Sequence, residues 1–121
     1  MRDDKLSIQS IDFAVRIINL VKELKNQHES IISNQIGRSG TSIGANIREA
    51  QYAHSKADFI TKLQIALKES NETSYWLELL YKTRYINESV YKDIDNLNIS
   101  IRTMLISSIN TAKENIEKKV N

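Results

Sequence analysis

The sequence SNQIGRSGTSIGANIRE, at residues 33–49, decides how the fold is interpreted, because it holds all three glycines of the chain. Four isoleucines in and beside it recur with the spacing of one face of an α-helix: Ile32, Ile36, Ile43 and Ile47. We therefore predict a helix over residues 30–52. The alternative is that the segment GRSGTSIG is a loop, since glycine in a helix interior costs about 1 kcal/mol relative to alanine.

The two flanks of this predicted helix differ in chemistry. Gly37, Gly40 and Gly44 fall along one flank, and their cost is compensated if a neighbouring backbone packs closely against them. The other flank is polar and consists of Gln35, Ser42, Asn46 and Glu49. These polar side chains are either solvated or form a hydrogen-bonded seam between helices, because buried polar groups must be paired.

Composition favours a single all-α domain over residues 1–121. The chain has no proline, and the tight turns of an all-β fold draw on glycine and proline. It also has no cysteine, which excludes disulfides and thiolate zinc sites and fits the reducing cytoplasm, where we expect the protein. No apolar run approaches the roughly 20 residues of a membrane span, and the N-terminal segment lacks the organisation of a signal peptide.

A helix over residues 7–27 carries two apolar stripes instead of one. The first consists of Ile8, Ile11, Val15 and Ile18, and the second, on the opposite side, of Phe13, Ile17, Leu20 and Leu24. A surface helix of a monomer needs only one apolar face, so we expect the other to contact a further copy of the chain. The residues predicted for that oligomer interface are Phe13, Ile17, Leu20, Leu24, Ile65, Trp76 and Leu79.

Two more helices are predicted over residues 56–83 and 88–117. Ser55 and Asp58 form a capping box for the first, and Asn87 caps the second. Ser70, Thr73 and Ser74 interrupt the apolar stripe of the first, which suggests either close packing or a local polar contact. Short connections make consecutive helices antiparallel, so the expected fold is an up-down-up-down four-helix bundle.

No catalytic or metal-binding pattern is present, and we predict neither an enzyme nor a cofactor. Helical bundles that bind metals use Glu-x-x-His pairs, and the only histidines, His28 and His54, lie near helix ends without such a partner. The formal net charge is only +2. A weak basic surface is still possible, and the candidate phosphate contacts are Arg38, Arg48, Lys56 and Lys62.

The glycine-containing helix resembles the signature of the four-helix bundle proteins encoded in 23S ribosomal RNA intervening sequences, approximately S-Q-I-x-R-A-x-x-S-I-P-A-N-I-x-E-G. The matching segments are residues 33–36, Arg38 and residues 42–49, and further likeness follows in residues 66–70, 76–80 and 85–86. Two positions depart from the pattern: Gly44 stands where the family usually has proline, and Ala50 where it usually has glycine. The first replaces a rigid bend with a flexible one, and the second weakens the signal for a helix end.

The resemblance implies an antiparallel bundle that forms a homo-oligomer, typically a pentamer. It also implies kinship with the accessory variability proteins of diversity-generating retroelements, which are basic pentamers that bind nucleic acid and a reverse transcriptase. Two functions are therefore open. One is association with RNA, DNA or an RNA–protein complex, which the resemblance favours. The other is a scaffold for a protein partner, which the small net charge favours.

Overall fold

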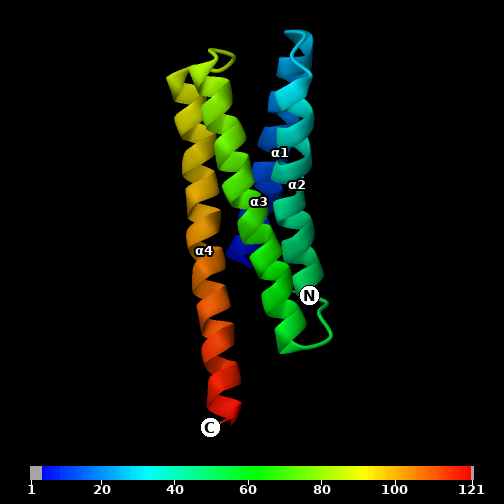
Figure 1. Cartoon of the computed structure of the whole chain (residues 1–121), viewed down its shortest axis with the longest axis vertical. Helices are drawn as coiled ribbons and strands as arrows, with labels where there is room; N and C mark the ends of the chain where they lie inside the picture. The colour runs from blue at the N-terminus through cyan, green and yellow to red at the C-terminus, as the bar shows by residue number, and fades with distance from the viewer. Residues whose placement is uncertain (1–3, 121) are drawn as a thin grey trace.

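The computed structural model describes residues 4–120, and in that range all regular structure is helical. The helices are α1 (Lys5–Asn26), α2 (Ile31–Ala50), α3 (Lys56–Lys82) and α4 (Glu88–Val120). The predicted helices are confirmed with shifts of a few residues at their ends. In Figure 1 the α1–α2 and α3–α4 connections lie at one end of the molecule and the α2–α3 connection at the other.

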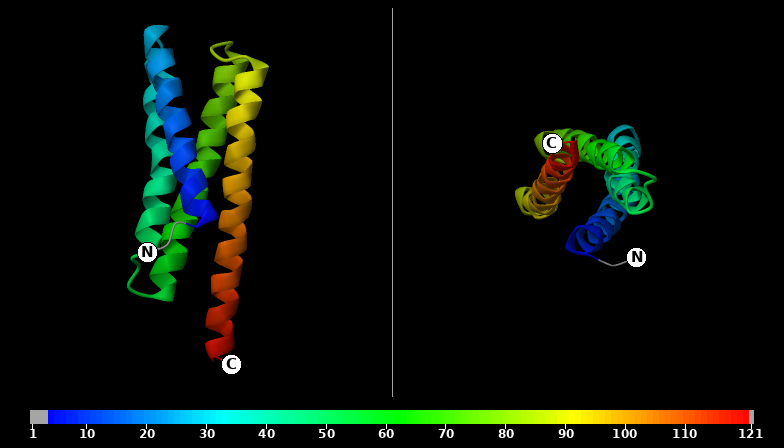
Figure 2. Two further views of the ribbon diagram at one scale, coloured as in Figure 1. Left: turned by 180° about the vertical axis from the view of Figure 1, so that it is seen from behind. Right: turned by 90° about the horizontal axis from the view of Figure 1, so that it is seen from below.

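The four helices pack in chain order, and the ring that they form is unevenly closed. α2 packs against both α1 and α3, α3 packs against α4, and the contact between α1 and α4 is sparse. Seen from below, the helices outline a horseshoe whose gap separates the start of α1 from the lower part of α4 (Figure 2). At about 1.5 Å per residue, the 33-residue α4 is also considerably longer than the 22-residue α1, so its lower part extends beyond the start of α1.

Helix ends are fixed by side-chain caps and by two residues in the left-handed conformation. The buried carboxylate of Glu29 accepts hydrogen bonds from the backbone N–H groups of Ile31, Ile32 and Ser33 at 2.7–3.0 Å, so it caps α2 although Ser30 occupies the cap position. His28 and Arg84 have φ values of 64° and 68° and end α1 and α3. The chain thus ends these helices without glycine, and its glycines remain available for packing.

The core confirms the predicted isoleucine face and corrects the prediction for α1. Ile32, Ile36, Ile43 and Ile47 are all buried. The stripe assigned to an oligomer interface is core instead: Phe13, Ile17, Leu20 and Leu24 are at most 7% exposed. The stripe about half exposed is the opposite one, consisting of Ile8, Ile11, Val15 and Ile18. Helical periodicity identified both stripes but not which of them faces α2 and α3.

The remaining interface residues, all on α3, are only partly free. Trp76 and Leu79 are half-buried and pack against the core, whereas Ile65 is 39% exposed. The indole N–H of Trp76 donates to Glu72 at 3.0 Å, which holds the ring against its own helix. Trp76 and Leu79 are therefore parts of the bundle wall, and only Ile65 of the seven predicted interface residues is exposed.

The glycine flank of α2 faces α1 and packs closely against it, but the nearest atoms are mainly side-chain atoms of α1 and not the neighbouring backbone that was predicted. A Cβ atom on Gly40 would lie 2.8 Å from Cγ1 of Ile17, inside the contact distance of real side chains. Gly44 meets Ser10 of α1 in the same way at 3.3 Å, and Gly37 meets Val21 at 3.4 Å. The glycines let the two helices approach closely enough for Ile17 to lie against the α2 backbone.

Two buried hydrogen-bonded pairs fix α3 between its neighbours. The Thr73 hydroxyl donates to Ser39 of α2 at 2.9 Å. The Ser70 hydroxyl donates to Oδ1 of Asn98 on α4 at 2.7 Å, and the Asn98 amide donates to the Ser70 carbonyl at 3.1 Å. The polar interruption of the α3 stripe is therefore the predicted polar contact, and it specifies register because slippage would leave these groups unpaired.

Candidate nucleic-acid interface

Two of the four predicted phosphate contacts lie at one hollow on the outer surface. Arg48, from the last turn of α2, and Lys62, from the second turn of α3, line a depression of about 400 Å³. Tyr52 and His54, from the connection between the two helices, line it as well, and Tyr52 is 64% exposed. Exposed aromatic rings and nearby cations are features that proteins use to bind an unpaired base and its phosphates.

Acidic groups reduce the positive charge of this hollow. The Lys62 ammonium lies 3.7 Å from a carboxylate oxygen of Glu49, and both Glu49 and Asp58 line the hollow. Arg48 is exposed, and within the described residues no carboxylate lies within ion-pair distance of it. The hollow therefore offers one unpaired guanidinium and one loosely paired ammonium, which is a modest anion site.

Arg38 is separate from that hollow and is already paired. Its guanidinium donates to Glu69 at 3.0 Å and also to Glu72, both on α3. A phosphate at Arg38 would have to displace two carboxylates, so its structural role is to join α2 to α3. We therefore remove Arg38 from the predicted phosphate contacts.

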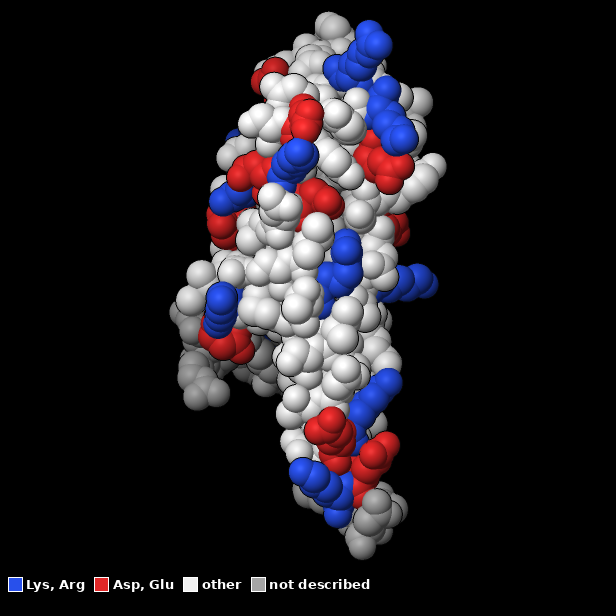
Figure 3. Space-filling view, turned by 90° about the vertical axis from the view of Figure 1, so that its left-hand side faces the viewer, with Lys and Arg blue, Asp and Glu red and all other residues white. Residues whose placement is uncertain are grey.

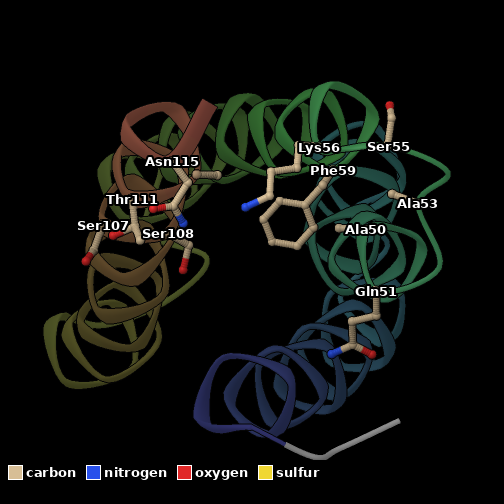
Figure 4. A pocket seen from close by; sticks show the side chains of 11 residues that line it. Ala50, Gln51, Ala53, Ser55, Lys56, Phe59, Ser107, Ser108, Thr111 and Asn115 are labelled. Carbon is tan, nitrogen blue, oxygen red and sulfur yellow. The ribbon is translucent and has the colours of Figure 1, made fainter. Parts of the chain in front are cut away.

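Lys56 does not line that hollow and lies at a second cavity. This cleft of about 600 Å³ lies between the start of α3 and the lower part of α4. In Figure 4 the side chains of Lys56 and Phe59 extend from α3 into it, and those of Ser108, Thr111 and Asn115 come from α4. Lys56 and the Arg48–Lys62 pair therefore belong to two different sites.

The side chains on the polar flank of α2 form more hydrogen bonds with the backbone of their own helix than contacts with other helices. The Ser42 hydroxyl donates to the carbonyl of Arg38 at 2.7 Å, and the Asn46 amide donates to the carbonyl of Ser42 at 2.8 Å. Gln35 is exposed, and Glu49 reaches α3 only through its ion pair with Lys62. The two alternatives for this flank are thus both partly realised: Gln35 is solvated, and Glu49 makes one contact between helices.

The surface mixes charges of both signs. The face shown in Figure 3, the left-hand side of Figure 1, carries Lys and Arg next to Asp and Glu.

On α4, burial raises the pKa of Asp95, the nearby Glu78 raises it further, and Arg102 opposes the shift. A buried oxygen of Asp95 and two buried guanidinium nitrogens of Arg102 have no hydrogen-bond partner within the described residues. Asp95 and Arg102 thus lack the full hydrogen bonding that Asn98 of the same helix has with Ser70.

The exposed stripe of α1 borders a shallow apolar groove. Ile11, Val15 and Ile18 form one wall, and Thr41, Ala45 and Arg48 of α2 lie along the other. The floor contains Ala14 and Gly44, and the groove has a volume of about 300 Å³. Small residues at the floor and branched residues at the rim are typical of surfaces where helices from two chains pack.

Sequence reasoning did not identify Tyr52, Phe59 or the polar side chains of α4 as site residues. Tyr52 lies beyond the last predicted core position of α2, and Phe59 is one of several apolar residues in the helix predicted for residues 56–83. A signal was present for α4: Ser108, Thr111 and Asn115 follow one another at helical spacing, on a face where a bundle helix normally continues its apolar stripe.

The described residues form a small all-α fold of four helices. Within residues 4–120 no group of His, Cys, Asp or Glu could hold a metal ion, and no helix is long and apolar enough to span a membrane. The family model of the 23S rRNA-intervening sequence proteins matches residues 2–107. The chain belongs to this family.

A solved structure supports the same assignment. A protein with unknown function from the S23 ribosomal protein family of Bacteroides thetaiotaomicron is 59% identical in sequence and superimposes with a TM-score of 0.85. The similarity covers 86% of this chain and 97% of that protein. Comparison with curated proteins gives no match.

Proposed function

We propose that the chain is a non-enzymatic protein that assembles with copies of itself and associates with RNA or an RNA–protein complex. In this proposal the subunit is an antiparallel bundle, and five subunits form the oligomer, as the family resemblance implies. The observation that carries the nucleic-acid part is the exposed Tyr52 beside Arg48 and Lys62.

Assembly strengthens this proposal because each subunit offers only a few cations. One hollow with two positive side chains binds phosphate weakly, but repeated hollows on one oligomer act together on a single nucleic acid. The exposed stripe Ile8, Ile11, Val15 and Ile18 is the surface we propose for the contact between subunits. Light scattering at micromolar concentration should give a mass several times 13.9 kDa, and a monomeric mass would contradict the assembly.

Binding is tested by fluorescence anisotropy with hairpin and duplex RNA and DNA at two salt concentrations. We expect binding that is largely independent of sequence and weakens steeply with salt. Changing Arg48 and Lys62 together to Ala should lower affinity and reduce the salt slope by about one for each phosphate that is no longer neutralised. The matched control is Lys22→Ala with Lys82→Ala, which removes the same charge from exposed positions elsewhere.

The second candidate function is a scaffold for a protein partner, favoured by the apolar stripe on α1 and the mixed surface charge. It would replace the nucleic-acid proposal if the native oligomer bound none of the four nucleic acids at low salt, where electrostatic attraction is strongest. An equal decrease in affinity in the Lys22/Lys82 control would show that net charge, and not the Tyr52 hollow, governs the interaction.

A further inference from the structure

The cleft at the open end of the bundle is the feature that the proposed function leaves unexplained. α4 continues to Val120, whereas the family match ends at residue 107. Four residues of the α4 wall lie beyond that point: Ser108, Thr111, Ala112 and Asn115. The cleft therefore depends on a part of this chain that the family model does not cover.

The two walls of the cleft have complementary chemistry. Ser108, Thr111 and Asn115 are spaced by three and four residues, so they lie on one face of α4 and present hydroxyl and amide groups. Lys56 and Phe59 are three residues apart on α3 and point into the same space (Figure 4). One wall thus offers hydrogen bonds, and the other offers an aromatic ring next to a positive charge.

Small residues keep the cleft open between these walls. Ala50 and Ala112 line it and are 3% and 6% exposed. The floor of the cleft is therefore apolar. A volume of about 600 Å³ lies within the roughly 300–1,000 Å³ of pockets that hold small ligands. A packed helix is a poor occupant, because it would cover the hydroxyl and amide groups of α4 with apolar side chains and leave them unpaired.

We infer that this cleft binds a nucleotide, with the base against Phe59, the phosphate at Lys56 and the ribose and base edges along Ser108, Thr111 and Asn115. A nucleotide combines the three features that the walls recognise: a planar ring, an anion and several hydrogen-bonding groups. The nucleotide is either free or an unpaired residue of a single strand. In the second case the inference deepens the proposed association with RNA, and it then rests on that proposal.

The experiment compares AMP, single-stranded hexa-adenylate RNA and a blunt RNA duplex by titration calorimetry with the full chain. Phe59→Leu keeps an apolar side chain but removes the ring, and Lys56→Gln removes the charge. We expect each change to weaken binding of AMP or of the hexanucleotide at least about fivefold, in keeping with the energy of one stacked base. The matched control Lys68→Gln, at another exposed position of α3, should change affinity by less than about twofold.

Thr111→Trp provides a second variant that does not touch the core, because Thr111 is exposed. The indole should fill the cleft and abolish binding of the single nucleotide while the helical circular dichroism stays unchanged. Tighter binding of AMP than of the hexanucleotide identifies a free nucleotide as the ligand, and the reverse identifies single-stranded RNA.

The outcomes separate this inference from the proposed function. If AMP and the hexanucleotide bind the native chain and the Thr111→Trp variant equally, or bind neither, the inference is overturned. If hairpin RNA still binds through Arg48 and Lys62 in that case, the proposed function stands alone. If AMP binds in the cleft but no RNA binds the chain, the inference stands and the nucleic-acid function falls.

Discussion

Helix α1 packs against α2 and α4 in two different ways. Toward α2, Gly40 lets the backbone approach Ile17 so closely that a Cβ atom would lie 2.8 Å from that side chain. Toward α4, polar side chains make the links: Ser100 donates to Gln9 at 2.9 Å, and Arg16 donates to Asp93 at 2.9 Å. The first contact is close and apolar, and the second is sparse and solvated.

The difference shows how residue size shapes the bundle. Glycine on α2 shortens the distance between helices, and dispersion and burial then hold them together. α4 contains no glycine, and polar side chains join it to α1: Ser100 with Gln9 and Asp93 with Arg16. The ring of helices therefore closes tightly on one side and opens on the other, where the cleft lies beyond the start of α1.

Breaking the close contact should have the largest effect. Gly40→Leu inserts a branched side chain against Ile17 and should lower the free energy of unfolding by about 1–3 kcal/mol through overpacking. Urea or thermal unfolding at fixed protein concentration measures the change. Gly37→Ala is the control: its Cβ would lie 3.4 Å from Val21, and the gain in helix propensity should stabilise the chain by up to about 1 kcal/mol. An unchanged midpoint for Gly40→Leu would contradict the importance of close packing.

A substitution at the sparse contact between α1 and α4 should lower stability much less. Arg16→Gln removes the ion pairs of Arg16 with Asp93 of α4 and Asp12 of α1, and these groups are 37–65% exposed. Solvent screens such pairs, so the free energy of unfolding should fall by less than about 1 kcal/mol. A double-mutant cycle with Asp93→Asn isolates the contact between the helices. A coupling as large as the destabilisation in Gly40→Leu would show that α1 and α4 are joined as firmly as α1 and α2.

The smallest effect on stability should come from a change at Asp95 of α4, and its size should depend on pH. Burial and Glu78 raise the pKa of Asp95 above its usual value of 3.8, and Arg102 only partly offsets them. The folded chain therefore binds this proton more tightly than the unfolded chain, so stability falls as the pH rises from the usual pKa through the folded pKa. Asp95→Asn should raise the melting temperature relative to the native chain more at neutral pH than at a pH near the usual pKa of the carboxyl group.

Asp93→Asn, on the exposed side of the same helix, is the control for that pH series. It removes a carboxylate that is paired with Arg16, so it should not stabilise the chain at neutral pH. An Asp95→Asn variant whose advantage is the same at both pH values would indicate that ionisation of Asp95 carries no cost in the fold.

Most of the helical structure was predictable because it depends on local chemistry. The caps at Ser55 and Asn87 are seen in the hydrogen bonds that their side chains accept from Asp58 and Val90. The candidate sites were less predictable, because a site joins residues from several helices. Arg38, Arg48, Lys56 and Lys62 look alike in sequence, yet one is paired across α2 and α3, two share a hollow and one lies at the cleft.

The sequence alone determined four helices, a buried isoleucine face and a glycine flank that needs a close neighbour, because each follows from spacing within one helix and from side-chain size. The tertiary structure decided which apolar stripe of α1 is buried. Both stripes have helical spacing and branched side chains, and only the packing of Ile17 against Gly40 places the Phe13 stripe inside and the Ile11 stripe outside. Periodicity defines the faces of a helix, and contacts between distant segments define the direction in which each face points.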